Sequence, residues 1–282
     1  LSYLEMGTPN GTIYVEKSSG NLVYTQDDFA VSNSQLDYGM SRVYNSQSER
    51  TSMLGKGWTD SYHKEIYTYG NDLYFVDSDG SAYLFELKDD GSYVCTETKN
   101  YELKLTGSGY AVETKDNVIY AFNRYGQLTE TTEPNSCSVE NIYDSLGRLR
   151  SVKSSESISE DKILTFVYDD EEHQLDYVTD LAGTKYTYDC TGNMLKKVTV
   201  TGKDAGNISY NYAYGGTSGK LETVVDGENN AYTIVYSGEK VDSVAYPDGE
   251  KFKFTYLSGK TVTDKMITLE ETEHIMYTQE SE

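Results

Sequence analysis

Two pairs of neighbouring carboxylates have the spacing in this sequence that best suits acid–base chemistry. Asp77 lies near Asp79, and Asp169 is followed by Asp170. Glycoside hydrolases use paired carboxylates about 5–10 Å apart, so both pairs are candidate catalytic groups. Asp77 and Asp79 are also candidate calcium ligands, although the glycine and terminal glutamate of an EF-hand loop are missing. All four residues fall in sequence typical of turns, and turn formation is the interpretation we favour.

The histidines and one glycine-rich segment do not form a recognised catalytic motif. His63, His173 and His274 are isolated from one another, without the His-x-x-x-His or His-Glu-x-x-His spacing of metal sites. Segment 55–58, Gly-Lys-Gly-Trp, superficially resembles a nucleotide loop but lacks its spacing and the helix that would follow. We expect Trp58 to anchor the opening turns of a sheet, with a sugar-stacking platform as the alternative. The sequence thus predicts no enzyme, no catalytic, cofactor-binding or metal-ligating residue, and no cofactor.

The three cysteines are odd in number and far apart. Cys95, Cys137 and Cys190 lack the close pairs of a zinc ribbon, and a disulfide scaffold needs many more. We interpret them as small, tolerated side chains, and their redox state stays open.

The chain is strongly acidic and rich in tyrosine. Its 282 residues carry 46 acidic and 24 basic side chains, a net charge of −22, and include 28 tyrosines. This charge repels phosphate backbones, so nucleic-acid binding is not expected. No apolar run approaches the ~18–20 residues that cross a bilayer. The first residues lack the basic region and apolar stretch of a signal peptide and begin without Met, so we expect a piece of a longer protein.

A turn motif recurs along the chain and is the element that must position these side chains. Residues 143–149 read Tyr-Asp-Ser-Leu-Gly-Arg-Leu, and residues 188–195 read Tyr-Asp-Cys-Thr-Gly-Asn-Met-Leu. Weaker copies occur at residues 123–128 and 168–175. The Asp can accept a hydrogen bond from the backbone two residues on. The Gly can take the left-handed conformation of a type I turn with a following bulge. Each copy therefore predicts a hairpin with Tyr and Leu on flanking strands.

The residues after these turns recur with a rough period. By subtraction, the steps between successive markers are 21, 26, 20, 26 and 20 residues, for Leu128, Leu149, Leu175, Leu195, Leu221 and Val241. A period in the low twenties fits two strands and two turns per unit. Between the markers, apolar and polar residues alternate, as in residues 252–256 and 232–236, which predicts strands with two unlike faces. We predict an all-β fold of stacked antiparallel hairpins that form a curled sheet, without a long amphipathic helix.

The order of several motifs resembles a known family. Residues 20–28, then 41–46 (Ser-Arg-Val-Tyr-Asn-Ser), then 54–62 (containing Gly-Lys-Gly-Trp) precede the Asp-Ser-Asp-Gly of residues 77–80. Together with the Tyr-Asp turns, this series is similar to the opening of a bacterial Rhs core. Rhs/YD-repeat proteins include bacterial polymorphic toxins, the C subunits of insecticidal toxin complexes and animal teneurins. The resemblance covers roughly residues 11–260.

The chain also departs from the family pattern. Glu171 and Glu172 occupy the turn that follows Tyr168, and other copies lack the Asp or the Gly. No Asp-Pro dipeptide occurs, so the self-cleavage segment of the family cannot be transferred to this chain.

On this basis we divide the chain into four predicted segments. Residues 1–35 are amino-terminal strands and an entry segment, and residues 36–120 are the opening of the Rhs-like core. Residues 121–260 are the YD-repeat hairpins, and residues 261–282 are an acidic tail or the start of a next repeat. Residues 153–161 have one apolar side chain and are expected to form a long loop or hairpin tip. For residues 270–282 we expect a frayed tail or part of a following unit.

The resemblance implies a structural role. Relatives wind a long β-sheet into a hollow shell around a toxin or other carboxy-terminal segment, so the expected partner is the rest of the parent chain. It also implies a secreted or wall-associated, extracellular bacterial protein. The alternatives are a module that binds cell-surface glycans through exposed aromatic rows and a glycoside hydrolase. We further predict self-association through free sheet edges unless they are bulged, charged or covered.

Overall fold

The regular structure of this protein is β-strand throughout the described residues. The computed structural model describes residues 2–9, 11–32, 37–154, 162–169, 174–202, 206–216, 218–258, 260–269 and 272–281. The all-β class with antiparallel sheets is therefore confirmed. The chain forms two compact units: unit 1 comprises Leu1–Asp27, Arg42–Trp58 and Tyr186–Glu282, and unit 2 comprises Asp28–Ser41 and Thr59–Lys185.

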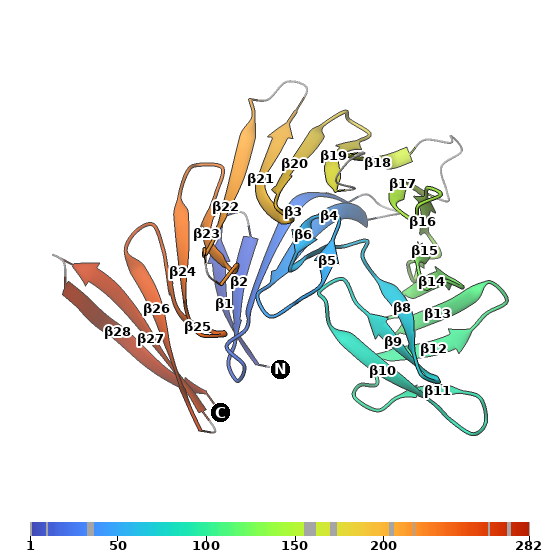
Figure 1. Cartoon of the computed structure of the whole chain (residues 1–282), viewed down its shortest axis with the longest axis horizontal. Helices are drawn as coiled ribbons and strands as arrows, with labels where there is room; N and C mark the ends of the chain where they lie inside the picture. Colours follow the sequence, from blue (N-terminus) through green and yellow to red (C-terminus); the bar gives the residue numbers. More distant parts are fainter. Residues whose placement is uncertain are drawn as a thin grey trace. The chain divides into compact units, whose positions relative to one another are not determined.

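Unit 2 is built mainly from an antiparallel meander in which each strand from β8 to β19 pairs with the next. The strands are β8 (Glu65–Tyr69), β9 (Asp72–Val76), β10 (Ala82–Leu87), β11 (Tyr93–Cys95), β12 (Tyr101–Leu105), β13 (Gly109–Thr114), β14 (Ile119–Asn123), β15 (Leu128–Thr132), β16 (Ser138–Tyr143), β17 (Leu149–Ser154), β18 (Lys162–Tyr168) and β19 (Leu175–Asp180). Figure 1 shows β8 to β14 as successive hairpins. Alternate residues of these strands share one core, which contains Ile66, Leu73, Phe75, Phe85, Leu103, Val112, Phe122 and Leu128.

Unit 1 combines amino-terminal strands with a carboxy-terminal meander. The first group is β1 (Tyr3–Thr8), β2 (Gly11–Glu16), β3 (Leu22–Ser32), β4 (Asp37–Asn45), β5 (Thr51–Ser52), β6 (Gly55–Lys56) and β7 (Trp58–Asp60). The second group is β20 (Lys185–Thr191), β21 (Met194–Thr201), β22 (Ile208–Tyr214), β23 (Leu221–Val225), β24 (Ala231–Ser237), β25 (Lys240–Ala245), β26 (Glu250–Leu257), β27 (Lys260–Leu269) and β28 (Thr272–Ser281). Strands β3, β4, β7 and β20 have residues in both units. One sheet has the order β1-β2-β3-β4-β7, and β21 to β28 pair consecutively, as seen for β22 to β28 in Figure 1.

The first turn motif folds as predicted. The Leu146 N–H donates to Asp144 Oδ1 at 2.9 Å, and Gly147 has a left-handed φ of 78°. Tyr143 pairs with Leu149 across the hairpin, and a β-bulge lies between Ile142 and Tyr143. The same pairing of an aromatic residue with the marker after the turn occurs as Phe122–Leu128, Tyr168–Leu175, Tyr214–Leu221 and Tyr236–Val241.

The second copy of the motif turns at a different place. Asp189 lies inside β20, and the bend is made by Gly192 and Asn193, whose φ values are 59° and 63°. Two consecutive left-handed residues form a type I′ hairpin turn, which matches the right-handed strand twist and competes with the Asp-led turn. The prediction that Asp189 begins the turn is therefore wrong, because Asn193 extends the Gly into a tighter two-residue loop.

The alternation of buried and exposed residues predicted from the sequence is present in β24. Tyr232 and Ile234 are buried whereas Thr233 and Val235 are exposed, which confirms strands with unlike faces.

Residues 272–281 form β28 and pair with β27, so this part of the tail is not frayed. Of the predicted loop at 153–161, Lys153 and Ser154 belong to β17, and residues 155–161 lie outside the described part of the chain. The four segment boundaries stay a prediction.

Candidate functional site

The most densely connected side chains of unit 1 surround Trp58. We call them the Trp58 cluster: Trp58, Arg42, Tyr24, Gln26, Tyr44, Tyr212 and Tyr214. The indole is 1% exposed, and its ring centroid lies 5.1 Å from that of Tyr212 and 5.4 Å from that of Tyr44. Edge and tilted ring contacts of this kind stabilise a core beyond the area they bury. The anchoring role expected for Trp58 is confirmed by its burial, which leaves no face of the indole for a sugar.

Arg42 is a fully buried cation within this cluster. Its guanidinium carbon lies 5.6 Å from the Trp58 ring centroid and 5.5 Å from that of Tyr212. Arg42 Nη1 donates to the Tyr212 hydroxyl at 2.9 Å, and that hydroxyl donates to Gln26 Oε1 at 2.7 Å. Gln26 Oε1 also accepts from the Tyr24 hydroxyl at 2.8 Å. The rings and the hydrogen-bond chain hold the charge in place, so the arrangement fixes the strands that carry these residues.

In four places among the described residues, a tyrosine hydroxyl links a strand to the residue that follows the previous turn. We call these hydrogen bonds the tyrosine latches. They join Tyr143 to the Leu128 carbonyl at 2.7 Å, Tyr214 to Leu195 at 2.6 Å, Tyr236 to Leu221 at 2.9 Å and Tyr256 to Val241 at 2.7 Å. Burial raises the pKa of Tyr143 to about 12 and raises the pKa of the other three hydroxyls too, so all four remain donors at neutral pH. The tyrosine of one repeat is thus hydrogen-bonded to the residue that follows the turn of the preceding repeat.

Loss of one latch is expected to cost about 1 kcal/mol of unfolding free energy, because a buried carbonyl loses its donor. In urea denaturation, Tyr236→Phe should lower the free energy of unfolding by this amount. The matched control is Tyr69→Phe, whose side chain is 69% exposed and whose change should be near zero. Equal effects of the two variants would show that the latch carries no stability.

The two carboxylates of the first candidate pair have different roles: Asp77 forms an ion pair, and Asp79 stabilises a turn. Asp77 Oδ1 forms an ion pair with Lys64, whose side chain is 10% exposed, and Asp77 Oδ2 accepts from the Tyr101 hydroxyl at 2.8 Å. Asp79 Oδ1 accepts from the Ser81 N–H at 2.8 Å, as expected for a turn. Burial acts to raise the pKa of Asp77, but the Lys64 charge and the hydrogen bonds outweigh it and lower the pKa. Both carboxylates are therefore occupied by structural bonds.

Lys64 also lies beside a hydroxyl in the geometry of a serine–lysine pair. Its Nζ is 3.0 Å from Ser78 Oγ and 4.7 Å from the Tyr120 ring centroid. A lysine that activates a serine acts in its neutral form, whereas Lys64 is engaged in the ion pair with Asp77. The arrangement is that of a buried ion pair capped by aromatic rings.

The ion pair predicts a pH-dependent loss of stability in Asp77→Asn. Because the folded pKa of Asp77 is lowered, its contribution is present above the unfolded pKa of about 3.9 and disappears as pH falls through the folded value. At pH 7 the variant should be about 2 kcal/mol less stable, since Lys64 loses its charged partner. The difference should vanish in acid. Asp116→Asn, at an exposed turn, is the control, and a pH-independent difference for Asp77→Asn would contradict the assignment.

The other candidate residues that the structure describes lie in separate elements of the chain. Asp169 begins a loop with its N–H bonded to the Gln174 carbonyl at 2.9 Å, and Asp170 lies outside the described residues, as do Glu171, Glu172 and His173. His274 contributes backbone to β28 opposite Ile267. Among the residues that the structure describes, no group of three His, Cys, Asp or Glu side chains is placed to hold a metal ion. The cysteines form no disulfide, and Cys190 Sγ lies 3.7 Å from the Leu54 carbonyl.

Asp60 is a buried titratable residue that sequence reasoning missed. Its side chain is 1% exposed, Oδ1 accepts from the Tyr62 N–H at 2.9 Å, and Oδ2 has no hydrogen-bond partner within the described chain. Burial raises the pKa of Asp60, and the nearby charge of His63 opposes that shift. An Asp two residues after a tryptophan carries no sequence signal for burial. His63 is the candidate histidine that lies near this buried carboxylate.

Comparisons with known proteins place similar sequence in toxin chains. The family model described as "Domain of unknown function (DUF6531)" matches residues 14–85. The chain is 25% identical over 259 residues to the tRNA nuclease WapA of Bacillus subtilis and to the tRNA3(Ser)-specific nuclease WapA of Bacillus spizizenii. Each match covers 85% of this chain and 11% of the relative, so this chain spans about a tenth of their length.

Two solved structures align with most of the chain at low similarity. The Photorhabdus luminescens Tc holotoxin pore covers 99% of this chain and 17% of its own, with 14% identity and a TM-score of 0.36. The crystal structure of TcdB2-TccC3 covers 96% and 17%, with 14% identity and a TM-score of 0.34. The described residues contain no helix that spans a membrane. The sequence relatives support the resemblance to Rhs/YD-repeat toxin proteins that the ordered motifs indicated.

Proposed function

We propose that this chain is a non-catalytic structural segment of a bacterial Rhs/YD-repeat shell that encloses or presents a carboxy-terminal toxin or effector. The observation that carries the proposal is the set of tyrosine latches, which uses the repeated Tyr and Leu to join one hairpin to the next. Such bonds connect consecutive hairpins within each unit and leave the turn Asp residues as backbone acceptors. Its partner is the rest of the parent polypeptide, and its location is extracellular, secreted or wall-associated.

The charge and the site geometry support a role without turnover. A net charge of −22 disfavours contact with RNA, so a nuclease activity like that named for the WapA relatives would belong to another part of the parent chain. The buried carboxylate of Asp77 serves an ion pair, and the Trp58 cluster is closed to solvent. The proposal therefore includes no cofactor and no catalytic residue.

Limited proteolysis of the full parent polypeptide tests the proposal. The carboxy-terminal segment should resist trypsin in the intact protein. A triple variant, Tyr143→Phe with Tyr236→Phe and Tyr256→Phe, should raise its cleavage rate by about a hundredfold, because three latches at about 1 kcal/mol each are lost. The control, Tyr69→Phe with Tyr125→Phe, changes exposed tyrosines and should leave the rate unchanged. Cleavage as fast as that of the isolated segment, before any substitution, would refute enclosure.

A second candidate function is binding of cell-surface glycans, favoured by an exposed aromatic patch on β8 and β9. Tyr67 and Tyr74 are cross-strand partners with ring centroids 5.1 Å apart and an interplanar angle of 12°. Tyr69, 69% exposed, packs edge-on against Tyr74 at 6.0 Å. Exposed, pre-arranged rings are suited to stacking on sugar faces. Saturable binding on a glycan array that Tyr69→Ala and Tyr67→Ala abolish would favour this function, and its absence would favour the structural one.

A further inference from the structure

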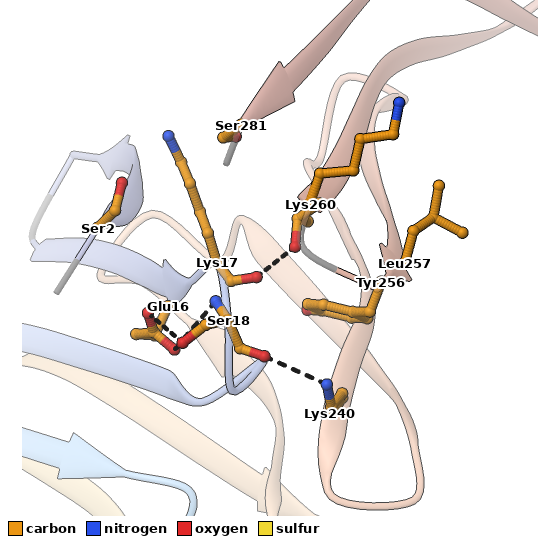
Figure 2. Close-up of a pocket in the computed structure, with 10 residues that line it drawn as sticks. Ser2, Glu16, Lys17, Ser18, Lys240, Tyr256, Leu257, Lys260 and Ser281 are labelled. Carbon is orange, nitrogen blue, oxygen red and sulfur yellow. Dashed lines mark hydrogen bonds between the residues drawn. The ribbon is translucent and has the colours of Figure 1, made fainter.

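A polar pocket of unit 1 lies between the loop after β2 and the strands β25 to β28. Its volume is about 390 Å³, within the range of small-molecule sites. Figure 2 shows that Glu16 and Lys17 line it from the loop side, and that Tyr256, Lys260 and Ser281 line it from the strands. We call it the lysine pocket because Lys17, Lys240 and Lys260 all contribute to its wall.

The wall of the lysine pocket is fixed by hydrogen bonds between segments distant in sequence. The buried Thr261 hydroxyl donates to the Lys17 carbonyl, and Lys240 Nζ donates to the Ser18 carbonyl at 3.2 Å (Figure 2). The Val241 N–H donates to the Gly20 carbonyl at 2.9 Å. Gly20 has a φ of 68°, and a Cβ there would come within 2.6 Å of the Lys240 Cβ, so the loop requires glycine at this approach. The cavity is consequently pre-formed, which lowers the ordering cost of binding.

Two of the three lysines around the pocket are held by partners, and carboxylates lie near them. Lys260 Nζ pairs with Glu280 at 2.8 Å, and the ammonium of Lys240 lies 4.6 Å from the Tyr256 ring centroid. Glu16 is directed into its own loop, where Ser18 and Ser19 donate to its carboxylate. Burial raises the pKa of Glu16, but these hydrogen bonds outweigh it and lower the value to about 2, so Glu16 stays ionised. The carboxylate of Asp242 also acts electrostatically on Tyr256, so the lysines around the pocket are balanced by carboxylates near it.

Two donors in the lysine pocket lack a partner within the described residues. The ammonium of Lys17 has no ion pair there, and Figure 2 shows its side chain extending away from Glu16. The Ser281 hydroxyl is buried and has no hydrogen-bond partner in the described part of the chain. A buried hydroxyl without a partner is costly, and an occupant that accepts its hydrogen bond removes that cost.

We propose that the lysine pocket binds one small carboxylate with a ring-shaped, hydroxylated body, that is, a sugar acid. Lys17 and Ser281 are the two donors without a partner among the described residues, and one carboxylate can accept from both. The face of Tyr256 supplies the apolar surface on which a ring lies. This binding site does not depend on the proposed enclosure role. A binding measurement therefore tests it separately from the proteolysis experiment.

Isothermal titration calorimetry of the chain with D-glucuronate at low ionic strength tests this site, with D-glucose as the neutral ligand of the same ring. Glucuronate should bind saturably, and glucose at least about tenfold more weakly, because it lacks the charge that Lys17 recognises. Lys17→Gln should weaken glucuronate binding by about tenfold, and Lys17→Arg should retain most of it. Ser281→Ala should weaken it by a few-fold. Lys253→Gln, at an exposed position of β26 outside the pocket, should leave it unchanged.

Further ligands decide which part of the probe is recognised. Acetate should bind more weakly than glucuronate, because it has no ring to contact Tyr256. Equal binding of glucose and glucuronate, tighter binding of inorganic phosphate, or an unchanged affinity in Lys17→Gln would each overturn the proposal. Thermal melting of every variant identifies a loss of folding, and Lys17→Arg provides the charge-retaining comparison if Lys17→Gln is unstable.

Discussion

Trp58→Ala is expected to lower the free energy of unfolding by about 3–5 kcal/mol, the cost of removing a large aromatic side chain from a closed core. The indole is 1% exposed and contacts the rings of Tyr24, Tyr44 and Tyr212. It also faces the guanidinium of Arg42, which the cavity would expose to water. Urea denaturation followed by tyrosine fluorescence and by circular dichroism measures the loss.

Two further substitutions separate packing from hydrogen bonding at this position. Trp58→Phe keeps a ring but removes the indole N–H, which donates to the Tyr214 hydroxyl at 2.8 Å, and should cost about 1–2 kcal/mol. Tyr125→Ala, at a side chain 72% exposed, should have almost no effect. A Trp58→Ala variant as stable as Tyr125→Ala would show that the cluster is not a core of unit 1.

Gly126→Ala is the second substitution with a large expected effect, about 3–5 kcal/mol from overpacking and backbone strain together. Gly126 has a φ of 82°, and a Cβ would lie 1.7 Å from the Ile66 carbonyl oxygen. That contact is with backbone, and the Ile66 N–H also donates to the Gly126 carbonyl at 2.9 Å. The turn and β8 cannot separate without losing this bond, so unit 2 should be strongly destabilised.

Gly80 provides a control with the same backbone conformation and open space. Its φ is 83°, and a Cβ there meets nothing within 4 Å, so Gly80→Ala should cost only the conformational strain of about 1–2 kcal/mol. Thermal melting of both variants compares the two positions. Equal losses would show that the approach of Gly126 to Ile66 is not maintained in solution.

The local part of this architecture is predictable from sequence. The Asp144 turn follows from residue types within seven positions, because an Asp acceptor and a left-handed Gly suffice to specify it. The alternation of Tyr232 and Ile234 with polar neighbours likewise predicts which face is buried. The sequence predicts a turn that begins at Asp189, whereas the bend is made by Gly192 and Asn193. The prediction fails because two turn types favour similar residues, and the strand pairing decides between them.

The candidate sites depend on contacts that local patterns do not encode. Arg42 meets Tyr212 across 170 positions, and Lys17 meets Thr261 across 244. A lysine in a strand carries no signal that it will pair with Asp77, nor an arginine that three rings will enclose it. These contacts follow from the order in which hairpins pair, so the ion pair, the tyrosine latches and the lysine pocket become visible only in three dimensions.

Electron cryomicroscopy of the full parent polypeptide tests most directly whether this chain is a structural segment of a shell. The account predicts that the latched hairpins continue into a wall whose interior contains density for the remaining chain. A map in which residues 1–282 form a separate module, with the remainder of the protein folded outside and no enclosed density, would contradict it.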